Sequence, residues 1–341
     1  MTIKKQPDLP MLDVMHPGVS APVQSSTSSQ SSGTASPSRA LIDHVQQVVV
    51  GKQPVVELAV TTLLAGGHLL IEDVPGVGKT VLARALARSV GATESRVQGA
   101  PDLLPTDLTG SSVWRPGGAD GDGSFEFIPG PLFANVVLVD EANRMSPRTQ
   151  AALLEAMEEG QVSTDGVTRA LPQPHIVIAT QNPSEHQGTY PLPDAQLDRF
   201  TAATSIGYPE PAHEARIITD QLRATPISGL GALMDLHQLA ALQADVRQVT
   251  ATPDLVDYVV RLVAGSRVLP GIAQGASPRA GLQLTRMAQA RALVAGRSHV
   301  LPDDVKALAE PVLCHRLIPH NETTSPADAI RDLVARTAVT G

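Results

Sequence analysis

The sequence predicts an α/β fold in which a parallel β-sheet flanked by helices is followed by a small, all-helical domain. Three observations support this prediction. A glycine-rich turn joins an apolar strand to a helical pattern, two further apolar runs end in polar side chains, and only helical patterns follow Tyr208. Short, continuous apolar runs are typical of strands that are buried on both faces of a parallel sheet. The 341 residues suffice for a tail and two compact domains.

The first 38 residues are predicted to be a disordered tail. Residues 20–38 are rich in Ser and carry Thr, Gln, Gly and Pro, a composition that cannot bury enough apolar surface to fold. From residue 41 to residue 64 apolar side chains recur at helical spacing, and Val50, Gly51 and Lys52 interrupt them. We therefore expect two helices separated by a short break.

The strand expected at 68–72 leads into a phosphate-binding loop. Gly76, Val77, Gly78, Lys79 and Thr80 follow it, and a helix is expected over 80–90. Glycines let successive backbone N–H groups surround a phosphate, and the positive end of the helix points at the same anion. Lys79 would reach the β- and γ-phosphates, and the Thr80 hydroxyl would bind Mg²⁺. The residues predicted to bind ATP, with Val50 and Gly51 near the base, are Val50, Gly51, Gly76, Val77, Gly78, Lys79, Thr80 and Val81.

One position departs from the strict pattern of such loops, which begins with Gly where this chain has Asp73. Asp accepts a left-handed backbone better than most residues but less well than Gly. The alternative interpretation of this segment is an ordinary glycine-rich turn between a strand and a helix.

An acidic pair follows the next apolar run, which covers residues 136–139 and continues into Asp140 and Glu141. Ligands of open α/β sheets bind at the carboxyl ends of the strands, so both acids should lie at the same sheet edge as the loop. Asp140 would hold Mg²⁺ together with Thr80, and Glu141 would act as the general base toward water. The alternative is a strand that simply ends in solvated acids.

The strand expected at 175–180 ends in Gln181, Asn182 and Pro183. An amide beside the γ-phosphate can orient the attacking water and respond to hydrolysis. We assign this role to Asn182, with Gln181 as the weaker candidate. The alternative is a turn without any chemistry, since Asn-Pro dipeptides mark turns.

Two arginines complete the predicted catalytic set. Arg199 is a candidate arginine finger that a subunit supplies to its neighbour's γ-phosphate, or else it forms a structural ion pair with Asp194 or Asp198. Ser277 and a following proline predict a helix start, and Arg279 lies in its first turn, where the helix dipole disfavours a cation. We therefore expect Arg279 to contact the nucleotide of its own subunit, the alternative being a solvated surface arginine.

The remaining elements are expected to be connections and helices. An insertion over 102–131 includes a turn-rich stretch and a strand at 124–128, and a β-hairpin is expected at 161–170 around Asp165 and Gly166. A short strand at 95–98 and a helix at 147–159 belong to the first domain. The later helices are expected over 211–223, 229–246, 253–265, 278–295 and 302–317.

The composition disfavours several classes of function. A net charge of −8 and an aromatic content of 2% argue against a protein that binds nucleic acid directly. The single cysteine, Cys314, excludes an intrachain disulfide and fits a reducing compartment. The histidines lack metal-ligand spacing, no apolar stretch reaches transmembrane length, and no signal peptide is recognisable. We therefore expect a cytoplasmic protein.

The order of these motifs resembles that of the AAA+ ATPases and, within them, the MoxR family. The match extends over about residues 41–320. The segments that carry it include the run from Glu72 to Thr80, the sequence Asp-Glu-Ala-Asn-Arg at 140–144 and the sequence Leu-Leu-Glu-Ala-Met-Glu-Glu at 153–159. One departure is Gly99, which stands where the family tends to have an aromatic residue. The other segments that carry the resemblance are 66–68, 101–105, 127–133, 179–183, 188–193 and 199–200.

The resemblance implies a domain plan and an assembly. Residues 39–208 would form the AAA+ core with inserts at about 102–131 and 161–170, and residues 209–341 would form the helical lid. It also implies a ring, usually a hexamer, with ATP and Mg²⁺ at each subunit junction and Arg199 acting across it. Proteins of this family resemble chaperones that remodel or mature protein complexes, and many act with a von Willebrand factor A domain partner.

Two other functions remain as alternatives on the sequence alone. One is a nucleic-acid motor of the related helicase type, which the acidic balance and the scarce aromatics disfavour. The other is a chelatase-type motor subunit, which helps to insert a metal into a cofactor. The protein client cannot be named from the sequence.

Overall fold

The computed structural model describes residues 36–339, except Pro75 and residues 117–122, 183–188, 224–225 and 322. Most of the predicted tail therefore lies outside the described residues. Its last residues begin the first helix, α1 (Pro37–Gln46), earlier than expected. The reason is a helix start that the sequence analysis missed, because the Ser36 hydroxyl accepts a hydrogen bond from the Arg39 backbone and a proline opens the first turn.

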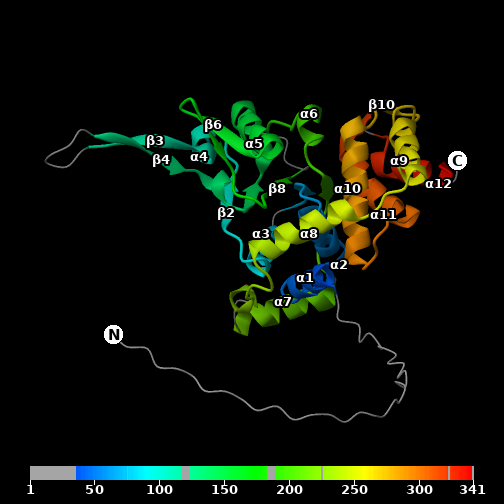
Figure 1. Ribbon diagram of the computed structural model, residues 1–341, viewed down its shortest axis with the longest axis horizontal. Coiled ribbons are helices and arrows are strands. Elements are labelled where there is room, and N and C mark those ends of the chain that lie inside the picture. The colour runs from blue at the N-terminus through cyan, green and yellow to red at the C-terminus, as the bar shows by residue number, and fades with distance from the viewer. Residues whose placement is uncertain are drawn as a thin grey trace, which may run out of the picture. The chain divides into compact units, whose positions relative to one another are not determined.

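Five parallel strands form the central sheet in the order β2-β5-β8-β1-β9 (Figure 1). Val139 of β5 pairs with Ala179 of β8, and Thr180 of β8 pairs with Ile71 of β1. The carboxyl ends of these strands therefore lie in a row, with β8 between the loop strand and the acidic strand. The strands are β1 (Leu69–Glu72), β2 (Glu94–Gln98), β5 (Val136–Asp140), β8 (Ile176–Gln181) and β9 (Ala202–Thr204).

The two faces of the sheet enter different hydrophobic clusters, which confirms strands that are buried on both sides. Leu69 and Ile71 pack with residues of α1, α2 (Gln53–Leu64) and α3 (Lys79–Ser89). Leu70, whose side chain points to the opposite face, packs with residues of α5 (Pro147–Glu159). Successive side chains of a strand point to opposite faces of the sheet, so a single apolar strand contributes to both hydrophobic cores.

Both inserts are antiparallel hairpins. The first pairs β3 (Gly110–Arg115) with β4 (Ser124–Pro129), after the short helix α4 (Pro105–Thr109). Only the second of these strands was predicted, because β3 is mostly exposed and lacks a clear apolar alternation. The second insert pairs β6 (Gln161–Thr164) with β7 (Val167–Ala170), as the Asp-Gly turn predicted.

The two hairpins contact each other. The Ser112 backbone N–H donates to the Asp165 carboxylate at 3.1 Å. The Arg169 guanidinium lies over the Phe127 ring, 3.8 Å from its centroid. In Figure 1 the β3–β4 hairpin extends away from the sheet, beside the β6 segment. A hydrogen bond and a cation–π contact therefore join the two inserts.

Helices dominate after residue 208, as predicted, with two differences. The expected helix at 229–246 begins only at Leu236, because Asp235 and Gln238 form a capping box that fixes a later start. The segment after residue 208, which the resemblance assigns to the lid, also has a small antiparallel ladder of β10 (Ile272–Gln274) and β11 (Ile318–Pro319). The helices of this segment are α7 (Pro211–Arg223), α8 (Leu236–Gln248), α9 (Pro253–Ser266), α10 (Pro278–Val294), α11 (Pro302–Leu313) and α12 (Pro326–Arg336).

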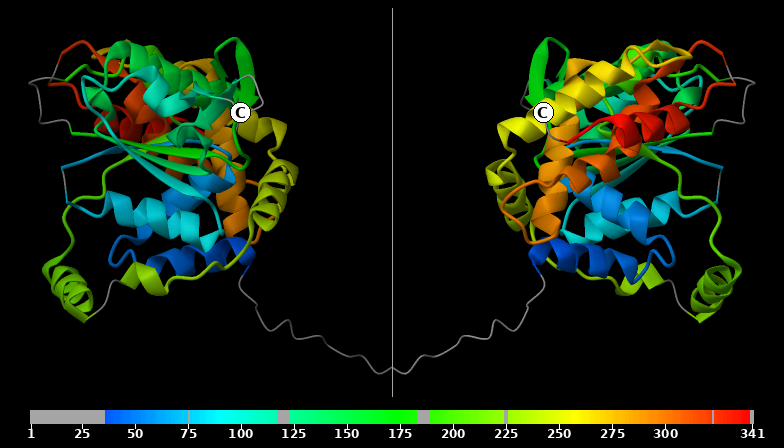
Figure 2. Two further views of the ribbon diagram at one scale, coloured as in Figure 1. Left: turned by 90° about the vertical axis from the view of Figure 1, so that its left-hand side faces the viewer. Right: turned by 90° about the vertical axis from the view of Figure 1, so that its right-hand side faces the viewer.

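Figure 2 shows the yellow-green helix α7 at the lower edge of the described residues, on the same side of the sheet's strands as the blue helix α1. The remaining short helices are α6 (Asp194–Leu197), η1 (Pro131–Phe133), η2 (Ala142–Arg144), η3 (Pro226–Gly229) and η4 (Cys314–Arg316). Within the described ranges no helix combines the length and the apolar character that a membrane span requires.

Candidate functional site

The glycine-rich loop has the backbone that a phosphate-binding loop needs. Gly76 and Gly78 have φ angles of 86° and 101°, a left-handed conformation that side chains disfavour. Gly78 is the residue before α3, and no side chain caps the first turn of this helix. The N–H groups of that turn have no acceptor inside the helix. A phosphate would supply these acceptors, so the loop and the helix start fit an anion.

Asp73 anchors the start of this loop instead of adopting a left-handed turn. Its φ angle is not among the positive values in the described chain. Its carboxylate accepts hydrogen bonds from the Ile206 and Gly207 backbone at 2.7 and 2.6 Å and from the Ser205 hydroxyl at 3.1 Å. Burial opposes ionisation, but the bonds from Gly207, Val74 and Ser205 outweigh it and lower the pKa of Asp73. The lower tolerance of Asp for a left-handed backbone is therefore no obstacle at this position, where the carboxylate binds the loop to residues 205–207.

A cavity of about 290 Å³ joins the loop to the acidic strand end. Thr80 and Asp140, the predicted magnesium ligands, both line it. Arg96 of β2 binds Asp140 at 2.7 Å, and the Thr180 hydroxyl lies 3.4 Å from the same carboxylate. The hydroxyl and carboxylate oxygens are ligand types that suit Mg²⁺. The residues that line the cavity are Gly76, Gly78, Lys79, Thr80, Val81, Arg96, Gln98, Asp140, Glu141 and Thr180.

Glu141 lies in the same cavity in an unusual backbone conformation. Its φ angle of 56° is left-handed, which costs roughly 1–3 kcal/mol for a residue with a side chain. The Gln98 amide and the Arg144 guanidinium hold its carboxylate at 3.0 and 3.1 Å. A Cβ atom on Gly99 would collide with the Glu141 carbonyl oxygen. The departure at Gly99 thus permits the close backbone approach beside the candidate general base.

A second cavity of about 450 Å³ adjoins the first, since Gly76, Gly78 and Val81 line both. Its walls are mainly apolar and come from the end of α1, the loop, residues 206–209 and α7. Val50 and Val77, two predicted ATP-binding residues, line it as well. Gly51 does not, but a side chain there would collide with His213 of α7. An apolar cavity that continues into a charged one suits a nucleotide, with the base in the first and the phosphates in the second.

Lys79 lies at the junction of the loop and the charged cavity. Its ammonium group donates to the carbonyl oxygens of Asp73 and Val74, at 3.0 and 3.1 Å. These contacts hold the cation inside the loop. The predicted residues Gly76, Gly78, Lys79, Thr80, Asp140 and Glu141 are therefore brought together as the sequence suggested.

Asn182 follows the central strand β8 and is buried. It lies at the carboxyl end of β8, between the loop strand and the acidic strand. The neighbouring Gln181 is engaged elsewhere, because its amide donates to the Glu72 carboxylate. Asn182 thus lies at the predicted edge of the sheet, although it lines neither of the two cavities.

Arg199 and Arg279 lie away from both cavities and contact one carboxylate. Arg199 binds Glu158 at 2.9 Å and donates to the Leu154 carbonyl at 2.8 Å, and Arg279 also pairs with Glu158. The ion pair considered between Arg199 and Asp194 or Asp198 is not found in the described structure. The expected contact of Arg279 with its own subunit's nucleotide has no counterpart either, because Arg279 lines neither cavity.

This arginine pair lies at the opposite edge of the sheet from the loop. The backbone N–H of Thr201, two residues after Arg199, donates to the carbonyl of His68, which precedes β1. The loop follows the other end of β1. Glu158 lies near the carboxyl end of α5, which begins beyond the acidic strand end and runs back along the sheet. Residues at the amino edge of a parallel sheet cannot reach ligands at its carboxyl edge without a large rearrangement.

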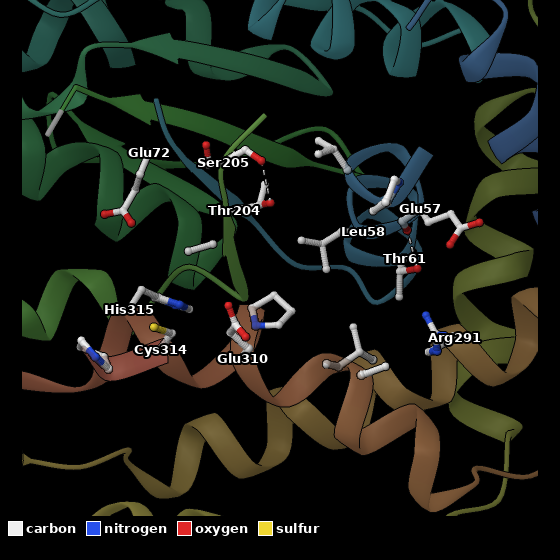
Figure 3. Close-up of a pocket in the computed structure, with 17 residues that line it drawn as sticks. Glu57, Leu58, Thr61, Glu72, Thr204, Ser205, Arg291, Glu310, Cys314 and His315 are labelled. Carbon is white, nitrogen blue, oxygen red and sulfur yellow. Dashed lines mark hydrogen bonds between the residues drawn. The ribbon is translucent and has the colours of Figure 1, made fainter. Parts of the chain in front are cut away.

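A third and larger cavity shares Val55 with the apolar cavity but no residue with the charged one. It measures about 860 Å³ and lies between β9 and the lid, with Thr204 and Ser205 on one side and Glu310, Cys314 and His315 on the other (Figure 3). None of the predicted catalytic or nucleotide-binding residues lines it. Burial and the nearby Glu310 raise the pKa of the Cys314 thiol to about 11, which makes it a poor nucleophile.

Several residues of the site were missed by the sequence analysis. Arg96 and Gln98 lie on a strand that was predicted, and their side chains contact Asp140 and Glu141. Residues two positions apart on a strand point to the same face, so this spacing could have predicted that both contact the acids. Glu158 and the apolar residues of α7 carried no such signal, because their contacts depend on the packing of distant segments.

Comparisons with known proteins agree with this geometry. The family model described as "ATPase family associated with various cellular activities (AAA)" matches residues 68–202, and the model described as "AAA lid domain" matches residues 264–333. The first match covers nearly all of the sheet, and the second covers α10, α11 and most of α12.

Similar proteins span most of the chain. "Uncharacterized protein YeaC" of Bacillus subtilis is 46% identical over 82% of this chain and 87% of its own length. "Chaperone MoxR1" of Mycobacterium tuberculosis is 43% identical over 81% of this chain and 74% of its own length. A crystal structure of a candidate ATPase from Cytophaga hutchinsonii superposes with a TM-score of 0.82 at 34% identity, covering 89% of this chain and 95% of that one.

Proposed function

We propose that this chain, which belongs to the MoxR family of AAA+ ATPases, uses ATP hydrolysis to remodel or mature protein complexes. The observation that carries the proposal is the single cavity that holds Lys79, Thr80, Asp140 and Glu141 at the carboxyl edge of the sheet. The name of its relative MoxR1, "Chaperone", supports the remodelling role.

Each residue of this cavity has a proposed role in ATP hydrolysis. The loop amides and Lys79 bind the β- and γ-phosphates, and Thr80 and Asp140 hold Mg²⁺, which neutralises phosphate charge. Glu141 accepts a proton from the attacking water, and its bonds to Gln98 and Arg144 fix its orientation. Asn182 orients the same water. Val50, Val77 and Val81 contact the adenine base.

The position of the arginine pair supports an assembly. Arg199 and Arg279 lie at the amino edge of the sheet, so we assign both to the nucleotide of an adjacent subunit. AAA+ proteins are usually oligomers, and we propose a hexameric ring in the cytoplasm. An arginine finger supplied across a subunit junction stabilises the negative charge that develops in the transition state.

The two inserts are the proposed contact with the protein client. The chain has one Trp and four Phe, and Trp114, Phe125 and Phe127 all lie on the β3–β4 hairpin. Trp114 and Phe125 are 51% and 70% exposed and pack edge to face. Exposed aromatic side chains are typical of protein contact sites. A von Willebrand factor A domain protein is a further proposed partner.

A trapping experiment tests the remodelling role. Glu141→Gln should bind ATP and hydrolyse it slowly, so that client and partner proteins stay bound to the stalled ring. The matched control is Lys79→Ala, which should not bind ATP. Proteins recovered with Glu141→Gln in ATP, but not in ADP and not with Lys79→Ala, should then be changed in assembly or activity by the wild-type protein and ATP. Identical recovery with both variants would contradict the proposal.

The same purified protein discriminates the two alternatives. ATPase activity that DNA stimulates in a salt-sensitive manner would indicate a nucleic-acid motor. Stimulation by a porphyrin-binding partner would indicate a chelatase subunit.

A further inference from the structure

A buried arginine of the lid holds the chain on both sides of Arg199. Arg316 lies in η4, and its side chain is 2% exposed. Its guanidinium donates to the Asp198 carboxylate at 2.9 Å and to the carbonyl oxygens of Asp198 and Phe200 at 3.2 and 2.6 Å. The neighbouring His315 ring nitrogen lies 3.0 Å from the Phe200 carbonyl oxygen. The backbone that carries Arg199 is therefore fixed from the lid.

The same aspartate holds the start of the helix that carries Arg279. The Ser277 hydroxyl donates to the Asp198 carboxylate, with both oxygens at 3.0 Å. Ser277 also caps α10 by accepting from the Ala280 backbone. Arg279 follows two residues later. Asp198 thus connects the segment of Arg199, the segment of Arg279 and the buried Arg316.

The resulting cluster has an excess of positive charge. Three cations, Arg199, Arg279 and Arg316, face two carboxylates, Glu158 and Asp198, in the ion pairs that the described chain forms here. A buried cation is costly unless it is paired. Breaking the ion pair between Arg316 and Asp198 would therefore destabilise the protein. The partly exposed Arg199 and Arg279 share Glu158 and remain the groups available to an anion.

We propose that Asp198 and Arg316 are positioning residues that hold Arg199 and Arg279 as one unit attached to the lid. A displacement of the lid then moves both arginines toward or away from the adjacent subunit's nucleotide. This inference rests on the proposed function, in which the two arginines act across a subunit junction.

The space beside the cluster is consistent with such movement. The cavity of about 860 Å³ is lined by residues of β9, α2 and α11, and His315 and Glu72 are among them. Figure 3 shows Glu310, Cys314 and His315 on the lid side, facing Thr204 and Ser205 across it. Lid and core are thus bonded directly at Asp198, and a cavity lies beside the strand that follows it. A displacement of the lid would be transmitted through the contacts of Asp198.

The test compares Arg316→Gln and Arg316→Lys with a matched control. Arg297 also forms a two-bond ion pair with a buried aspartate, Asp304, at 2.8 and 2.7 Å, but this pair lies wholly within the lid. Arg297→Gln should therefore lower the thermal stability as Arg316→Gln does, while the ATPase rate stays near that of the wild type. Arg316→Gln should reduce kcat about tenfold or more with little change in ATP affinity, and Arg316→Lys should recover part of kcat.

Mixed rings then assign the defect to one side of the junction. Arg199→Ala mixed with Lys79→Ala should regain activity, because some junctions combine an intact site with an intact finger. If Arg316 positions the finger, Arg316→Gln should likewise be rescued by Lys79→Ala and not by Arg199→Ala. Each activity is compared with that of the two unmixed variants at equal total concentration.

Three results would overturn the proposal. Rescue of Arg316→Gln by Arg199→Ala, but not by Lys79→Ala, would place the action of Arg316 on its own subunit's site. A loss of ring assembly or ATP affinity that matches the loss of activity would leave only a structural role. If Lys79→Ala fails to rescue Arg199→Ala, Arg199 does not act on the neighbouring subunit's nucleotide. This outcome tests the proposed function and not the role of Arg316, because neither variant changes Arg316.

Discussion

The phosphate-binding cavity and the arginine cluster are both charged sites on the same parallel sheet, but they lie at opposite edges and are assembled differently. At the carboxyl edge, a single loop and the ends of neighbouring strands supply Lys79, Thr80, Asp140 and Glu141. At the amino edge, Arg199 and Arg279 come from segments about 80 residues apart and meet on the carboxylate of Glu158. This difference indicates that one subunit carries two complementary half-sites, which serve two different nucleotides.

The largest expected effect concerns the arginine cluster. Arg199→Ala should lower kcat by about 10³-fold, the lower range for arginine fingers, while ATP affinity measured with a fluorescent analogue stays within a few fold of the wild type. The physical reason is that the finger acts on transition-state charge and lies away from its own subunit's cavity. A comparable loss of ATP affinity would place Arg199 beside the bound nucleotide of its own subunit. It would contradict the assignment of the two charged sites to different nucleotides.

The next effect concerns the carboxyl edge. Glu141→Gln should lower kcat by about 10²-fold, since a general base contributes 10²–10⁴-fold, and should leave ATP bound. Unlike Arg199→Ala, this variant should gain no activity when mixed with Lys79→Ala, because neither partner then offers an intact site. Equal turnover of Glu141→Gln and the wild type in single-turnover measurements would refute the base assignment.

A smaller effect is expected from acidification, and part of it arises beside the arginine cluster. Burial and the nearby Arg316 lower the pKa of His315 to about 3, and burial and His175 lower that of His68 to about 4. Both groups ionise near 6.5 when unfolded, so the unfolded chain binds more protons below that pH. Stability is therefore fully present above pH 6.5 and declines as the pH falls through the range toward 4 and 3.

Urea unfolding at pH 7.5 and pH 5 measures this decline. Each buried histidine should account for on the order of 2 kcal/mol between these two pH values. His315→Gln should remove about half of the combined change and leave the share of His68. An unchanged pH dependence in His315→Gln would show that burial and the nearby Arg316 do not hold His315 neutral.

The smallest effect on hydrolysis is expected outside both charged sites. Trp114→Ala and Phe125→Ala should leave the basal ATPase rate within about twofold of the wild type, because both side chains are exposed and distant in the chain from the site residues. They should reduce client capture by Glu141→Gln. The control is Val268→Ala, an 81% exposed lid position. Equal client capture by all three variants would show that the β3–β4 hairpin does not contact the client.

Prediction from the sequence was most successful where function depends on neighbours along the chain. The loop, its strand and its helix are contiguous, so Gly76 to Thr80 could be assigned from their order alone. The strand end at Asp140 followed from a run of four apolar residues, at positions 136–139, all of which are buried. The parallel sheet then brought both segments to one edge, which is a general property of such folds.

Prediction was less successful where a partner lies far away in sequence. Asp73 was judged by its backbone preference, whereas its carboxylate binds residues more than 130 positions later. Arg199 was matched with the nearby Asp194 or Asp198, but its partner is Glu158, and Asp198 instead binds Arg316. Proximity along the chain predicts caps and turns well, because the groups that form them are local. Ion pairs between distant segments depend instead on packing that single residues do not encode.

The contacts between the two hairpins have a consequence for engineering. Ser112 with Asp165 and Phe127 with Arg169 each take one member from either hairpin. These contacts join the two hairpins into one unit. The Ser112 donor is a backbone N–H that any residue except proline supplies, whereas the cation–π contact needs a particular side chain from each hairpin. A chimera that exchanges only one hairpin with a relative therefore keeps the cation–π contact only if the relative supplies the matching side chain, whereas a joint graft carries both partners.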